Sequence, residues 1–332
     1  MKIRALLLSI ALAASAFVGA PAQAANLTIG IAYDIGGRGD RSFNDAAALG
    51  LAKAQKEFTF AVEPVVTDGS SVDRDRRVRS LIAKNCNPII AVGSGYAATL
   101  QGLAVEFPNT QFAILNDASI DALNVTSLIF ADAQGAFLAG FSAAMISKSG
   151  TVAMIADENQ ADLYHNGFVA GVAESKKAVT PIVKYVNGSS VTATKQAMDA
   201  GADVIFVARP GSNTEIFASI VARNTAKAKS KNFKQVGLIT SEPDQYVTVT
   251  SRSKKFLYAT VVKRVDKAMY DVISKAVSGS QYLDEIDSTA GIYGRQYSVN
   301  GGGITFTTYL PALTALTAEI NRAAATASKL RR

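Results

Sequence analysis

A short run of acidic, amide and glycine residues near the start of the chain has the clearest capacity for ligand chemistry. Within residues 33–45, Asp34, Asp40 and Asn44 supply carboxylate and amide groups. The glycines between them permit positive φ angles and close approach of the backbone to a ligand. An apolar strand, a glycine-rich turn and a helix in this order place a ligand at the carboxyl end of the strand. A plain surface turn explains the spacing equally well, since one glycine cluster is a weak signal.

The residues that follow give a start signal for a helix. Ser42 precedes an amphipathic pattern, and Asp45 stands three positions later. This pairing is typical of a capped helix N-terminus, so we expect the helix to begin at Phe43.

The remaining chemistry-bearing residues do not assemble into a catalytic pattern. His165 is the single histidine, so a catalytic triad or histidine-rich metal site would depend on it, and a solvent-side or capping histidine is favoured. Ser94 follows a predicted strand but is not in a G-x-S-x-G turn, and no G-x-x-x-x-G-K-[ST] loop is present. We therefore expect no enzyme, no cofactor and no metal site.

The first 24 residues have the character of a secretion signal. Lys2 and Arg4 precede a mostly apolar segment, and Ala22-Gln23-Ala24 forms a small-x-small cleavage site. No cysteine stands at that point for lipid attachment. We expect an exported chain that starts at Ala25 and acts in the periplasm or cell envelope, with no membrane span of its own.

The cysteine content and the net charge further limit the possible functions. Cys86 is the only cysteine, so it cannot pair within the chain, and we expect it to be a buried small apolar residue. The formal charge of +7 falls to about +5 without Lys2 and Arg4. Basic clusters at 74–79, 227–234 and 254–255 do not interleave with aromatic residues, which argues against nucleic-acid binding. We favour the interpretation that these basic clusters lie on solvated faces of the protein, and adhesion to an anionic envelope is the minor alternative.

Apolar runs alternate with alanine-rich helical patterns along the whole chain, which predicts an α/β protein with parallel sheets. Ten strands are many for one sheet, so we expect two Rossmann-like lobes. The predicted lobes are 25–130 with about 241–262, and 131–240 with about 263–332. Predicted strands are 27–33, 60–66, 88–92, 112–115, 127–130, 152–155, 182–186, 204–207, 236–239 and 256–262. Predicted helices are 44–58, 73–83, 97–107, 133–147, 163–175, 190–200, 215–229, 262–277 and 312–332.

Several motifs resemble one known family. Residues 36–51 resemble the signature G-x-x-D-[KRQ]-S-F-N-x-x-x-x-x-G of the basic membrane protein family, which comprises substrate-binding proteins of ABC importers similar to the purine nucleoside receptor A lipoproteins. Further stretches resemble this family in the same order along nearly the whole mature chain. They are 91–96 (AVGSGY), 108–115 (PNTQFAIL), 134–140 (QGAFLAG), 201–206 (GADVIF), 242–246 (EPDQY) and 262–266 (VKRVD).

The resemblance implies a type I periplasmic-binding-protein fold, with two lobes joined by a three-segment hinge and the ligand between them. It also implies nucleoside binding, with aromatic rings on the base and carboxylates plus a lysine on the ribose hydroxyls. A small-molecule ligand, a membrane permease as partner and a monomeric state follow from it.

The resemblance also assigns site residues. Asp40 and Asn44 would contact the ligand at the first cleft edge, and Tyr96 would be the remaining stacking ring, because Ser94 stands where the family often has Phe. Groups for the hydroxyls would be Asn116 or Asp117, Glu242 or Asp244, and Lys263. Arg38 and Arg209 would also face the cleft, where they could instead favour an anionic ligand.

Two rival functions remain at this point. An exported sensor could present its ligand to a membrane receptor, and the sequence does not separate this role from import. A secreted Rossmann-type enzyme would need a catalytic constellation that the sequence does not show.

Overall fold

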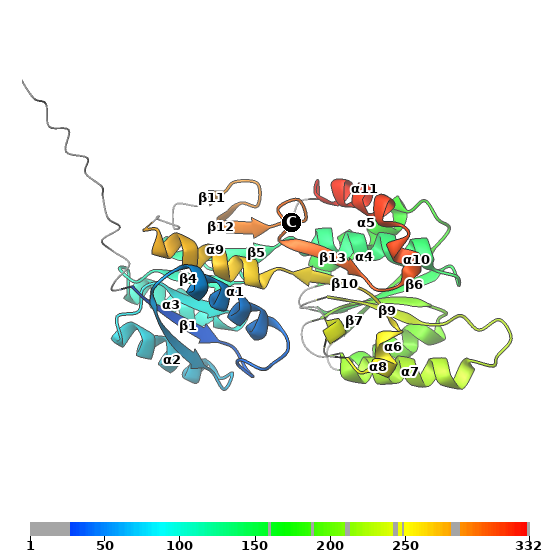
Figure 1. The fold of residues 1–332 in the computed structure, drawn as a ribbon, viewed down its shortest axis with the longest axis horizontal. Helices are drawn as coiled ribbons and strands as arrows, with labels where there is room; N and C mark the ends of the chain where they lie inside the picture. Colours follow the sequence, from blue (N-terminus) through cyan, green and yellow to red (C-terminus); the bar gives the residue numbers. More distant parts are fainter. Residues whose placement is uncertain are drawn as a thin grey trace, which may run out of the picture.

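The computed structural model forms two α/β lobes that lie side by side along the long axis of the molecule (Figure 1). It describes residues 27–158, 161–186, 189–209, 213–241, 245–247, 249–279 and 286–330. The predicted secretion signal lies outside these residues. Within them, no helix is long and apolar enough to cross a membrane.

The first lobe is built on a seven-stranded sheet in the order β11-β12-β5-β4-β3-β1-β2. Helices α1 and α9 cover one face of this sheet, and α2 and α3 cover the other. The strands are β1 (Thr28–Tyr33), β2 (Ala61–Val66), β3 (Ile89–Val92), β4 (Phe112–Leu115), β5 (Val125–Phe130), β11 (Ile286–Asp287) and β12 (Ile292–Tyr297). The helices are α1 (Phe43–Glu57), α2 (Ser71–Ala83), α3 (Ala97–Glu106) and α9 (Val265–Val277).

The second lobe is built on a six-stranded sheet in the order β13-β10-β9-β8-β6-β7. The strands are β6 (Thr151–Asp157), β7 (Thr180–Val186), β8 (Val204–Ala208), β9 (Gly237–Ser241), β10 (Leu257–Lys263) and β13 (Ile304–Thr308). The helices are α4 (Asp132–Ile146), α5 (Ala161–Glu174), α6 (Ser190–Asp199), α7 (Thr214–Lys227), α8 (Ser251–Lys254), α10 (Pro311–Thr314) and α11 (Thr317–Ala327).

All ten predicted strands are present, and nearly all of their pairings are parallel. Helices cover both faces of each sheet, so central strands such as β3, β4 and β8 are buried on both sides and continuously apolar, whereas the edge strands β2 and β7 are partly exposed. The two-sheet α/β prediction is therefore confirmed.

The chain crosses between the lobes three times, at residues 130–132, 263–265 and 297–304. Backbone hydrogen bonds tie the crossings together, from Ala131 N to Tyr297 O at 3.0 Å and from Arg264 N to Gly303 O at 2.9 Å. This is the three-segment hinge that the family resemblance implies.

The predicted division of the C-terminal half between the lobes is wrong. We expected 241–262 in the first lobe, but β10 pairs with β9 in the second sheet. We expected all of 263–332 in the second lobe, but α9 packs on α1 and β12 pairs with β5 in the first. The reason is physical, because any buried parallel strand has the same apolar character and does not reveal which sheet it joins.

Helices α4 and α5 pack unusually closely through glycines. A Cβ atom added at Gly171 would lie 2.0 Å from the carbonyl oxygen of Phe137, and one at Gly140 would lie 2.1 Å from that of Phe168. The two helix backbones are thus in direct contact, with no side chain between them at these positions.

Candidate functional site

The loop between β1 and α1 is organised by the carboxylate of Asp40. Its Oδ1 accepts hydrogen bonds from the backbone N of Ser42 (2.8 Å) and Asp45 (3.1 Å), and its Oδ2 accepts one from Asn44 N (3.1 Å). The helix begins at Phe43 as predicted, but Ser42 makes no side-chain cap bond. The predicted cap is therefore wrong, because Asp40 satisfies the first free amides in its place.

Asn44 lies beneath this loop with 3% of its surface exposed. Its Oδ1 accepts a hydrogen bond from Asp34 N at 3.0 Å, and its Nδ2 donates to the carbonyl oxygens of Ile35 (3.2 Å) and Asp34 (3.4 Å). Both ends of the amide thus hold the backbone at the carboxyl end of β1. In this structure Asn44 therefore holds the backbone of the candidate site in place through its side-chain hydrogen bonds.

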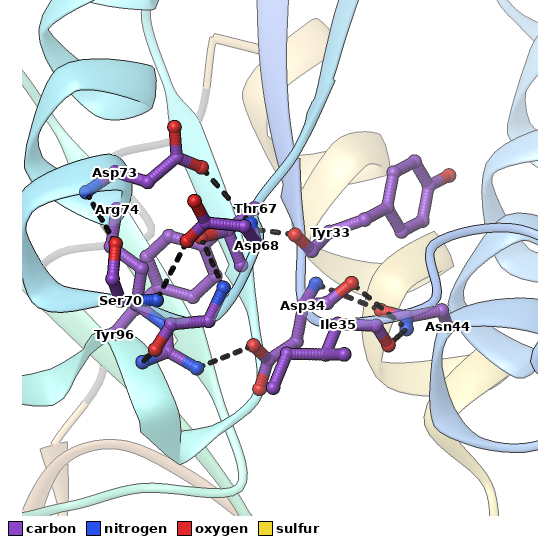
Figure 2. A network of polar contacts seen from close by, with 11 residues as sticks. Tyr33, Asp34, Ile35, Asn44, Thr67, Asp68, Ser70, Asp73, Arg74 and Tyr96 are labelled. Carbon is purple, nitrogen blue, oxygen red and sulfur yellow. Dashed lines mark hydrogen bonds and ion pairs between the residues drawn. The ribbon is translucent and has the colours of Figure 1, made fainter.

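An ion pair between Asp34 and Arg74 joins the ends of the first three strands (Figure 2). Arg74 Nη2 lies 2.7 Å from Asp34 Oδ1, and Nη1 donates to the carbonyl oxygen of Gly69 at 2.7 Å. The guanidinium carbon is also 5.5 Å from the ring centroid of Tyr96. Arg74 is only 13% exposed, so it departs from the solvated role expected for its basic cluster.

Tyr96 is fully buried in the core of the first lobe. Its hydroxyl donates to the carbonyl oxygen of Tyr33 at 2.8 Å, and burial raises the pKa of Tyr96. A ring in this position has no free face for a ligand, so the placement argues against the predicted stacking role. Ser94 lies two residues earlier and is exposed, at the start of a 3-10 turn (Ser94–Tyr96).

Asn116 and Asp117, the two alternatives at the end of β4, differ in what they contact. Asn116 has a left-handed backbone (φ 68°), and its Oδ1 accepts a hydrogen bond from Lys263 Nζ at 3.3 Å. Asp117 accepts hydrogen bonds from the backbone N and the hydroxyl of Ser119, within its own turn. The structure therefore directs Asn116, rather than Asp117, toward Lys263.

Lys263 connects the two lobes at the hinge. Its side chain is 2% exposed, and Nζ lies 2.9 Å from Oδ1 of Asp132, whose side chain is 10% exposed. A buried ammonium is costly unless it is paired and hydrogen-bonded, and Asp132 and Asn116 together supply these partners. Because Lys263 ends β10 and Asn116 directly follows β4, the carboxyl edges of the two sheets meet here.

Aromatic rings from both lobes surround this ammonium. Nζ of Lys263 lies 6.0 Å from the ring centroid of Phe130 and 5.7 Å from that of Tyr164. Phe130 in turn lies against Tyr297 (5.6 Å between centroids) and Phe43 (6.4 Å). A charged, hydrogen-bonding group inside aromatic walls is suited to a flat ligand that carries polar substituents.

A second ion pair marks the carboxyl edge of the second sheet. Arg209 follows β8, and its Nε lies 2.5 Å from Oδ1 of Asp157 at the end of β6. Arg38 is exposed on the β1–α1 loop. Glu242 and Asp244 lie outside the described residues, so their predicted roles stay predictions.

Cys86 is 2% exposed and free, as predicted, and burial raises the pKa of its thiol. His165 is partly exposed on α5, and its Nδ1 contacts the hydroxyl of Tyr185. Among the described residues, no group of three His, Cys, Asp or Glu side chains is placed to hold a metal ion.

Sequence reasoning did not select Arg74, Asp132, Asp157, Phe130 or Tyr164. A signal existed for two of them: Asp132 and Asp157 each lie two residues beyond a predicted strand. Residues at the carboxyl ends of parallel strands line the ligand site of open α/β sheets. No comparable signal pointed to Arg74, which contacts Asp34 from the next crossover helix.

Two α/β lobes that meet at their carboxyl edges, with a buried polar cluster at a three-segment hinge, define the class of two-lobe ligand-binding proteins. Residues 28–294 match the family model of PnrA-like ABC transporter substrate-binding proteins, and the chain belongs to this family.

Curated relatives are similar over part of their length. An ABC transporter nucleoside-binding protein, BmpA, of Lactococcus lactis is 27% identical over 64% of each chain. A CD4+ T-cell-stimulating antigen of Listeria innocua is 30% identical over 61% of this chain and 59% of its own. The chain thus spans about 60% of the length of these relatives.

Solved structures support the fold. A transcriptional activator of the comK gene from Bacillus halodurans has a TM-score of 0.72 at 18% identity, covering 91% of this chain and 98% of its own. An ABC transporter solute-binding protein from Aeropyrum pernix K1 has a TM-score of 0.66 at 21% identity, covering 91% and 85%. The type I solute-binding-protein fold is therefore confirmed.

Proposed function

We propose that the chain is the exported ligand-binding component of an ABC importer and takes up a neutral, flat, hydroxyl-bearing molecule of the nucleoside kind. The observation that carries this proposal is the buried Lys263 ammonium, held by Asp132 and Asn116 between aromatic rings of both lobes. Ribose hydroxyls can form charge-assisted hydrogen bonds with such a cluster. Phe130 and Tyr164 are 5% and 3% exposed, so they contact a base only where separation of the lobes uncovers their rings.

The charge balance of the site supports a neutral ligand. Arg74, Arg209 and Lys263 are each paired with a carboxylate, from Asp34, Asp157 and Asp132 respectively. A phosphate would have to compete with these carboxylates for the cations, and its own charge would be costly to bury beside them. A nucleoside carries no such charge, so we expect it to bind more tightly than its nucleotide.

The family membership and the relative named as a nucleoside-binding protein agree with this ligand class. In the proposed cycle the lobes close over the ligand by rotation at the three crossings, and the closed form is presented to a permease. We expect a monomer to carry out this cycle.

The test is a calorimetric titration of the chain that begins at Ala25 with nucleosides, nucleotides, free bases, ribose and amino acids. Lys263→Ala should weaken nucleoside binding by more than tenfold, since it removes the cation that organises the polar cluster. The matched control is Lys267→Ala, which removes a lysine that is paired with Asp271 at 2.9 Å but is 36% exposed on α9. Circular dichroism of both variants checks that they remain folded.

Nucleoside affinity that is the same in folded Lys263→Ala as in the wild type would refute the role of Lys263. Tight binding of nucleotides without binding of nucleosides would refute the neutral ligand class.

A further inference from the structure

We propose that the end of the second lobe that lies away from the first lobe docks on an anionic bilayer surface. Four loops lead into the amino ends of β6, β7, β9 and β10, and each carries exposed basic side chains. We call this set the basic edge. Its exposed members are Lys148, Lys176, Lys177, Lys227, Lys229, Lys231, Lys234, Arg252 and Lys255, of which Lys227 ends α7 and Arg252 lies in α8. Lys254, also in α8, is a partly exposed member.

The strand pairing brings these loops together. The starts of the parallel strands are neighbours in the sheet, as in the pairs Thr151↔Thr180, Val204↔Gly237 and Leu257↔Leu238. Five strands at a spacing of about 4.8 Å give an edge about 20 Å across. Figure 1 shows the loop between α7 and β9, in yellow-green, at the end of the molecule away from the first lobe.

The carboxylates on the same edge do little to neutralise it. Asp203 is 4% exposed and accepts hydrogen bonds from Ser147 Oγ and from the backbone N of Lys148 and Ser149. Asp199 is already paired with Arg223 at 2.8 Å.

Within the described residues, none of the side chains of the basic edge has a carboxylate within 4.0 Å. Asp203 and Asp199 are engaged elsewhere, and the exposed Glu174 at the end of α5 offsets only one of the positive charges, so the edge keeps a net positive charge.

The far end of the first lobe is different. There Lys84 is paired with Glu63 at 2.7 Å, and Arg79 is paired with Glu106 at 2.6 Å. These two basic side chains of the first lobe are therefore neutralised by carboxylates, unlike those of the basic edge.

The side-chain chemistry favours a lipid surface. Lysines are flexible point charges, suited to diffuse attraction by anionic headgroups, and each one near such a surface strengthens partitioning by about fivefold. Nucleic-acid platforms add rings on which bases stack. Here the exposed ring of Tyr246 is already stacked on Tyr309 (4.4 Å between centroids) and contacted by Lys254.

The basic edge and the candidate site lie at opposite ends of the same strands. β10 spans seven residues, Leu257–Lys263, and a strand of that length is about 20 Å long. Docking would therefore leave the interlobe site open, and this inference does not depend on the proposed ligand.

The test is co-sedimentation of the chain that begins at Ala25 with phosphatidylcholine vesicles, with or without about 30 mol% phosphatidylglycerol. We expect binding only to the anionic vesicles, and its loss in about 1 M salt, where the Debye length falls to about 3 Å. Neutralising three exposed lysines of the basic edge, Lys229→Gln, Lys231→Gln and Lys234→Gln together, should weaken binding at least about tenfold.

The matched control neutralises three exposed lysines elsewhere: Lys53→Gln, Lys56→Gln and Lys329→Gln. It has the same net charge as the test variant, so an equal loss in both would show that only total charge matters and would overturn the proposal. Equal binding to pure phosphatidylcholine would also overturn it, as would binding to a DNA duplex without binding to anionic vesicles.

Discussion

The ammonium of Lys263 and the carboxylate of Asp132 lie 2.9 Å apart where the chain first and second crosses between the lobes, and both side chains are nearly excluded from water. The attraction between two such charges offsets the cost of burying them, but neither charge is tolerated well alone. The pair therefore ties the polar chemistry of the site to the stability of the hinge.

Removing one partner should show this dependence. Asp132→Ala should lower the free energy of unfolding in urea by about 3–5 kcal/mol, because it leaves a buried ammonium without its counter-ion. The double variant Asp132→Leu with Lys263→Met should regain most of that loss, since no buried charge remains. Glu63→Ala in the exposed pair with Lys84 is the control and should cost less than about 1 kcal/mol. Equal losses in Asp132→Ala and Glu63→Ala would contradict the interpretation.

The variant Tyr96→Phe distinguishes a structural role of Tyr96 in the core from a role in ligand binding. The change removes the hydrogen bond to the Tyr33 carbonyl and should cost about 1 kcal/mol of stability. The same carbonyl oxygen also accepts a hydrogen bond from Thr67 N at 3.3 Å, so it is not left unpaired in the variant. Ligand affinity should stay within about twofold of the wild type by calorimetry, because the ring is enclosed in protein. A tenfold loss of affinity in a stable variant would mean that Tyr96 reaches the ligand.

Gly171→Ala tests the close packing of α4 and α5. The added methyl would meet the carbonyl oxygen of Phe137 and force the helices apart, with an expected loss of about 1–3 kcal/mol. Gly102→Ala, in α3, is the control, since nothing lies within 4 Å of its added Cβ. That substitution should be neutral or stabilise by up to about 1 kcal/mol. Thermal unfolding of the two variants gives the comparison, and a stabilised Gly171→Ala would refute the packing argument.

Lowering the pH should reduce the stability of the first lobe through protonation of Asp73. Its hydrogen bond from Arg76 is the largest cause of a pKa held well below the ordinary range, followed by the hydrogen bond from the backbone of Asp68. A depressed pKa in the folded state means that the stabilisation is complete above about pH 4 and is lost as the pH falls further. Asp73→Asn should therefore flatten the pH dependence of the unfolding temperature below about pH 4. A profile parallel to that of the wild type would exclude this contribution.

The sequence predicted most of the fold because the sheets are parallel and covered on both faces. Continuous apolar runs such as 112–115 therefore marked every strand of the first ten. β11, β12 and β13 were missed, because they are short, partly exposed and polar, as in the IYGRQY of β12. Their lobe membership depends on pairing partners distant in the chain, which local patterns do not encode.

The candidate site was only partly predictable. Lys263 and Asn116 were selected from family motifs, and the structure brings them together. Arg74 was missed, because it acquires its role from a partner more than thirty positions away. Asp132 has a position just beyond a predicted strand as a signal, but its pairing with Lys263 is equally distant in the chain. Tyr96 shows the opposite error: an aromatic residue after a strand fits a binding cleft or a core equally well, and only packing decides between them.

The three crossings between the lobes affect how the chain folds during synthesis and transport. The first sheet has no partner for β5 on its outer side until residues 292–297 arrive, and the second sheet has no partner for β10 until 304–308 arrive. The first sheet is therefore incomplete until β12 has been synthesised, and the second sheet until β13 has been synthesised. A nascent chain therefore keeps open strand edges until these residues have been added, which would favour a form that an export channel can thread.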